Sequence, residues 1–168
     1  FAPTFYNIRY LTKDFALFIK KASINIEPKQ LLWASLSFTN AQINGFSIKS
    51  QNLKVTHGSL LASGTLNSFS YEAMAKTEIE YLPINQAMLK GTGSFDSLTI
   101  SQGILKGTKS NIELSGQFST SISNWNFHYD GNLESVTLSG KSHGSFIKNK
   151  LLAINSFKIN GQYQHLNM

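Results

Sequence analysis

The sequence predicts an all-β protein, mainly an antiparallel meander in a curled or trough-like sheet, with one or two short helical turns. Apolar and polar residues alternate at period two in many short runs, as in strands with one buried face. Glycine turn signals such as Asn44-Gly45 and Asp130-Gly131 separate the runs. Connections this short join antiparallel neighbours and cannot carry a parallel crossover. We expect residues 1–168 to form a single β-rich domain.

The N-terminal residues predict two strands. In residues 1–11, Tyr6, Ile8 and Tyr10 alternate with polar residues, which indicates an edge strand. Residues 15–26 begin with an apolar run and then alternate, so they predict a second strand that is covered on both sides at its start.

A short helical turn is expected at residues 28–33. Pro28 has no N–H for a β-ladder, and its fixed φ suits the first position of a helical turn. The apolar residues Leu31, Leu32 and Trp33 would then fold back over the sheet edge.

Three strands are expected next, at residues 36–42, 46–54 and 60–66, with Asn44-Gly45 and His57-Gly58 as turn signals. The alternation changes parity near Asn40 and Gly45, which predicts a bulge or bend at each place.

Residues 71–81 carry the clearest strand pattern, although a helix over residues 71–76 is an alternative. Residues 82–89 then repeat the order of strand end, proline and apolar helical turn. This defines a weak internal repeat around residues 22–48 and 77–105.

The second half predicts a series of short strands separated by glycine turns. They cover residues 94–101, 103–106, 111–118, 125–131, 136–140, 144–147, 152–160 and 161–163.

A long meander with one apolar face must hide that face. It can close as a barrel, pack as a sandwich, or curl into a trough that faces lipid or a second sheet. Trp125, Phe127 and Tyr129 share one face, where structural core is one role and lining an acyl-chain groove is the alternative. The full set of groove candidates is Trp125, Phe127, Tyr129, Phe18, Leu31, Leu32 and Trp33.

Four segments carry a family resemblance: residues 22–33 (ASINIEPKQLLW), 64–66 (GTL), 91–95 (GTGSF) and 97–107 (SLTISQGILKG). In this style of "strand, Pro, x, x, Leu-Leu, strand" units and glycine-punctuated strands, the chain resembles the periplasmic part of AsmA/TamB-type proteins. It is also similar to the related type II secretion N protein. The resemblance implies a periplasmic envelope protein of a Gram-negative bacterium, tethered to the inner membrane by a segment missing from this chain. It also implies a role in phospholipid movement or in assembly of envelope machinery.

Motifs for catalysis, metals and cofactors are missing from the sequence, so we expect no enzyme and no cofactor. The four histidines lack metal-ligand spacing, and no serine lies in a Gly-x-Ser-x-Gly elbow. Gly91-Thr92-Gly93 lacks the third glycine of a dinucleotide site. The absence of cysteine excludes disulfides and thiolate zinc sites.

The net charge of +6 is carried almost entirely by lysine, with Arg9 as the single arginine. Specific nucleic-acid sites rely on arginine forks, so we expect no nucleic-acid partner and keep a weak attraction to anionic lipids as an alternative.

Two function classes follow. One is a lipid-contacting or lipid-shuttling β-groove, with phospholipid or a membrane surface as partner. The other is a protein-interaction scaffold of a secretion or envelope assembly that uses exposed sheet edges. The sequence leaves the oligomeric state open.

Overall fold

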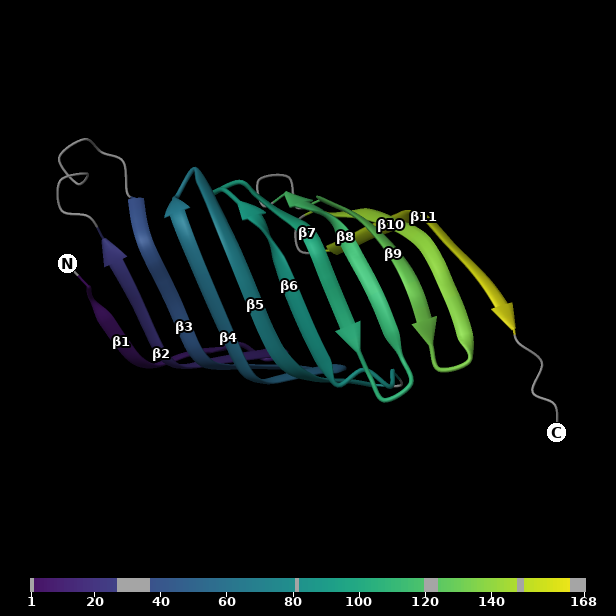
Figure 1. The fold of residues 1–168 in the computed structure, drawn as a ribbon, viewed down its shortest axis with the longest axis horizontal. Coiled ribbons are helices and arrows are strands. Elements are labelled where there is room, and N and C mark those ends of the chain that lie inside the picture. Colours follow the sequence, from purple (N-terminus) through teal and green to yellow (C-terminus); the bar gives the residue numbers. More distant parts are fainter. Residues whose placement is uncertain (1, 27–36, 81, 120–123, 148–149, 164–168) are drawn as a thin grey trace.

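The computed structural model describes residues 2–26, 37–80, 82–119, 124–147 and 150–163. These form one sheet of eleven strands, and each strand lies beside its neighbours in the sequence (Figure 1). The strands are β1 (Thr4–Leu11), β2 (Phe15–Ile26), β3 (Ser37–Ser50), β4 (Leu53–Thr65), β5 (Ser68–Ile79), β6 (Gln86–Gly93), β7 (Ser97–Lys106), β8 (Asn111–Ser119), β9 (Asn124–Leu133), β10 (Val136–Ile147) and β11 (Lys150–Tyr163).

Every neighbouring pair of strands is antiparallel. The predicted all-β meander is therefore confirmed. The sheet is open, with β1 at one edge and β11 at the other, so the barrel alternative is wrong. The predicted edge strand at the N-terminus is β1.

Several strands are longer than expected, because predicted turns lie inside them. β3 runs through Asn44-Gly45, and β4 runs through His57-Gly58. Gly45 and His57 have positive φ angles of 68° and 53°, and pairing resumes beyond each with a shifted register. One left-handed residue makes a bulge, whereas reversing a chain requires two central turn residues. Asp130-Gly131 and Ser139-Gly140 also lie within strands, β9 and β10, and there the pairing of β9 with β10 continues without a register shift.

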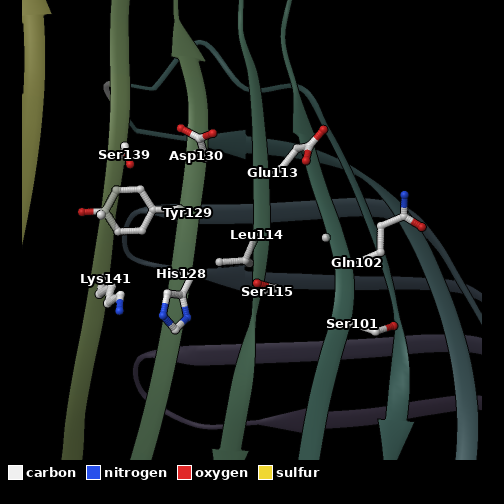
Figure 2. A pocket seen from close by; sticks show the side chains of 12 residues that line it. Ser101, Gln102, Glu113, Leu114, Ser115, His128, Tyr129, Asp130, Ser139 and Lys141 are labelled. Atoms are coloured by element: carbon white, nitrogen blue, oxygen red, sulfur yellow. The ribbon is translucent and has the colours of Figure 1, made fainter.

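Three residues with positive φ lie in one row across the N-terminal strands. We call this row the bend row: Asn7, Lys20, Gly45 and His57, of which Lys20 has an ordinary backbone. Asn7 also has a positive φ, 56°, and the register places it and Gly45 on either side of Lys20. The bends predicted near Asn40 and Gly45 are confirmed by register shifts at both places. Figure 1 shows the ends of the N-terminal strands turning beneath the sheet, and Figure 2 shows N-terminal strands crossing behind the C-terminal ones.

The second predicted helical turn, at residues 82–89, is wrong. The Asn85 N–H donates to the Lys106 carbonyl at 2.8 Å, and the Asn85 carbonyl accepts from the Thr77 N–H at 3.0 Å. This backbone therefore belongs to the β-ladder, and the alternation that follows it forms β6. The first predicted helical turn, at residues 28–33, lies outside the described residues. Within the described ranges, no helix is long and apolar enough to cross a membrane.

The two faces of the sheet differ in burial. On β5, Tyr71 and Thr77 are buried while Glu72 and Lys76 are exposed. We call the face that carries Tyr71 the inner face and the opposite one the outer face. Among the described residues, the buried hydrophobic side chains are Val55, Ala62, Tyr71 and Ile84. The chain exposes 12095 Å², against roughly 8,200 Å² expected for a compact protein of its mass. All described strands belong to this single sheet.

Candidate functional site

The inner face is a continuous apolar surface built from every other residue of consecutive strands. Strand register places these residues in rows that cross the sheet; one row runs from Tyr71 through Gly91, Ile100 and Gly116 to Phe127. The larger side chains of the inner face on β5 to β9 are those of Phe69, Tyr71, Leu89, Leu98, Ile100, Leu105, Ile112, Leu114, Phe118, Trp125, Phe127 and Tyr129. Of these residues, Tyr71 is buried, Leu98 is exposed, and the others are half-buried, so a ligand could reach part of each half-buried side chain.

Three of the predicted groove residues lie together on this face. Trp125, Phe127 and Tyr129 alternate along β9, and all three are half-buried. They come from the strand whose outward-facing residues include His128. The pattern of alternation was sufficient to identify them as neighbours on one side of the sheet.

Large inner-face side chains lie over glycines of the adjacent strand. Phe127 lies opposite Gly116, and Trp125 lies opposite Gly144. A Cβ atom added at either glycine would collide with the ring of its partner. The same arrangement joins Phe46 to Gly58. Because glycine has no side chain, the ring can pack directly against the backbone of the neighbouring strand. These pairs therefore contribute apolar surface close to the backbone of the inner face.

The polar ends of two inner-face aromatics are hydrogen-bonded. The Trp125 Nε1–H donates to Ser142 Oγ at 3.3 Å, and the Tyr71 hydroxyl donates to the Thr99 carbonyl at 3.2 Å. Burial raises the pKa of the Tyr71 phenol above its ordinary value. Because these polar atoms already have partners, the ring carbons are the part of each residue that a ligand would meet.

The structure does not bring all predicted groove residues together. Phe18 pairs with Ser47 in the register, and its neighbour Leu17 pairs with Ile48, which lies opposite the buried Val55. Leu17 is therefore on the inner face and Phe18 on the outer face. There the Arg9 guanidinium carbon lies 5.6 Å from the centre of the Phe18 ring. Leu31, Leu32 and Trp33 lie outside the described residues.

The groove candidates named from the sequence left out the part of the inner face contributed by β5 to β8. Phe69, Leu89 and Leu114 belong to the same surface as Phe127. Each lies in an alternating run, so the signal was present. What alternation cannot provide is the register that connects one strand's apolar face with the next.

The outer face carries a polar hollow of about 460 Å³ across β7 to β10, shown in Figure 2. The acidic and basic residues that line it are Glu113, His128, Asp130 and Lys141. Glu113 lies directly opposite Asp130, and His128 lies opposite Lys141. Within the described part of the chain, no three His, Cys, Asp or Glu side chains are arranged to hold a metal ion.

The fold and this surface define a class: an open, curled antiparallel meander with one apolar face. The chain matches no protein-family model, and no match was found among curated proteins or solved structures.

Proposed function

We propose that this protein is a non-enzymatic, lipid-contacting module whose inner face receives acyl chains. The observation that supports this most strongly is a wide, continuous surface of large apolar side chains on one face of an open sheet. Covering roughly 300 Å² of apolar surface contributes about 7 kcal/mol. An acyl chain can provide that cover.

The cellular setting of the proposal rests on the AsmA/TamB resemblance alone. On that basis the domain works in the periplasm of a Gram-negative envelope, tethered to the inner membrane by a segment outside this chain. The role is to shield or pass on phospholipid between membranes.

A fluorescence experiment tests whether the inner face contacts acyl chains. The chain has two tryptophans, Trp33 and Trp125, so the variant Trp33→Phe leaves Trp125 as the sole indole. Phospholipid with brominated acyl chains quenches an indole only on close contact. We expect strong quenching of Trp125, because its ring lies on the inner face.

Two controls accompany that experiment. Phospholipid without bromine must leave the emission of the Trp33→Phe variant largely unquenched. Replacing Phe127 with serine should weaken quenching in a protein whose circular dichroism still reports a folded sheet. If brominated lipid leaves Trp125 unquenched, or if Phe127→Ser only unfolds the domain while lipid binding persists until unfolding, the acyl-groove proposal is wrong.

A protein-interaction scaffold is the second candidate, and β1 is the observation that favours it. All eight residues of this edge strand are exposed. Phe5, Tyr6 and Tyr10 are 52%, 64% and 58% exposed. An edge strand offers unpaired backbone N–H and C=O groups to an added strand. Native mass spectrometry distinguishes the candidates: bound phospholipid supports the groove, whereas a lipid-free chain that also refuses added lipid supports the scaffold.

A further inference from the structure

A second hollow lies on the outer face of the N-terminal strands, away from the inner face. It has a volume of about 520 Å³ and is lined by residues of β1 to β4. Its outer-face apolar members include Leu11, Ala16 and Phe18. Leu11 is 72% exposed, so an apolar surface is available to a partner here.

Positive charge surrounds this apolar surface. Arg9, Lys49 and Lys54 all line the hollow. Lys49 lies directly opposite Lys54 in the register of β3 and β4. Like charges opposite each other on one sheet face destabilise the pair, so this arrangement favours an anion between or above them.

The acidic groups nearby neutralise only part of that charge. Glu78 on β5 binds Lys54, with Nζ 2.9 Å from both carboxylate oxygens. Among the described residues, Lys49 has no acidic partner within ion-pair distance. Arg9 lies against the Phe18 ring, which orients its guanidinium without cancelling its charge.

We propose that this hollow docks the domain on a bilayer containing anionic phospholipid. The phosphate of the head group would lie near Lys49 and Arg9, and the interfacial apolar atoms would lie against Leu11 and Phe18. Charge complementarity identifies the partner, because the hollow combines a cationic rim, of which only Lys54 is ion-paired within the described part of the chain, with accessible apolar side chains. This surface is on the opposite side of the sheet from the acyl-binding face, so the inference does not depend on the proposed function.

Vesicle flotation tests the inference with a charge-matched control. The probe is phosphatidylcholine vesicles with and without phosphatidylglycerol, at low ionic strength. The variant R9Q/K49Q removes two positive charges from the hollow, and K109Q/K141Q removes two from beyond β7. Both carry the same net charge. Each basic residue at an anionic surface changes binding by about fivefold, so R9Q/K49Q should bind phosphatidylglycerol vesicles roughly 25-fold more weakly. K109Q/K141Q should lose less than about twofold.

Further arms make the result decisive. Circular dichroism must show that both variants are folded, and K49R should restore binding in the K49Q background. Equal losses in the two double variants would overturn the inference, because the attraction would then be a property of net charge. Equal binding to pure phosphatidylcholine would also overturn it. If inorganic phosphate alone binds with the same dependence on Arg9 and Lys49, the site takes a free anion and the bilayer assignment is wrong.

The vesicle assay also separates this inference from the proposed function. Leu89→Gln alters the inner face and leaves the hollow intact. It should leave binding to phosphatidylglycerol vesicles unchanged even where it weakens uptake of acyl chains.

Discussion

At the scale of single residues, the inner face depends on pairs in which one strand supplies a ring and the next supplies a glycine. Gly144 and Gly116 leave the space that Trp125 and Phe127 occupy. A methyl group at either glycine would push the ring off the sheet. The glycines of this sequence therefore shape a surface as well as ending runs of alternation.

Tyr71 provides a test at this scale. Its pKa is raised by burial, so the folded state holds the phenolic proton more tightly than the unfolded state does. The stability that this contributes is fully present below the unfolded pKa of about 10 and is lost as pH rises through the higher folded value. In the Tyr71→Phe variant, the free energy of unfolding should therefore fall less at alkaline pH than it does in the wild type. Urea unfolding at neutral pH and above pH ~10 checks this.

The same variant has a second expected effect. It removes the hydrogen bond from the Tyr71 hydroxyl to the Thr99 carbonyl, so it should cost about 1 kcal/mol at neutral pH. A control is Tyr6→Phe, because Tyr6 is 64% exposed on β1. Parallel alkaline losses in the wild type and Tyr71→Phe would contradict the role of burial.

Sequence patterns could predict part of the candidate site at this scale. Trp125, Phe127 and Tyr129 were placed on one face by alternation alone, and the structure agrees. Phe18 was also named as a groove candidate, but its run is apolar on both sides, and the structure places it on the outer face. Its location became clear only through the register that joins Leu17 to Ile48 and Ile48 to Val55.

At the scale of elements, the bend row determines the curvature of the N-terminal strands. Asn7, Gly45 and His57 each adopt a left-handed backbone at the same level of the sheet. Asn-Gly and His-Gly are equally good signals for a turn and for a bulge. Sequence reasoning therefore located the irregularities at Gly45 and His57 but read both as chain reversals, and it gave no signal for Asn7.

Gly45→Ala tests the bend row. Gly45 has a φ of 68°, and a Cβ there would lie 3.0 Å from the Lys20 Cβ. We expect a loss of about 1–2 kcal/mol in the free energy of unfolding. Asn7→Gly, in the same row, relieves a positive φ and should cost little. Denaturant titration measures both, and equal effects of the two would show that backbone strain is not the cause.

At the scale of the whole molecule, the apolar inner face is the feature that a ligand can stabilise. Leu89 and Met88 are adjacent in β6 but lie on opposite faces, and Met88 is 42% exposed. Phospholipid at about 100 times its dissociation constant should stabilise the wild type by about 2.7 kcal/mol. Leu89→Gln should reduce that gain, and Met88→Gln should preserve it. Thermal unfolding with and without lipid provides the measurement, and equal reductions would contradict an inner-face site.

The order of the strands also bears on how the molecule forms. Every described strand pairs with the strands that come just before and after it in the chain. Because paired strands are close together in the sequence, these contacts have a low contact order. Closing each hairpin therefore costs little loop entropy. During synthesis, each new strand finds its partner already present, so the sheet can grow from its N-terminal edge one hairpin at a time.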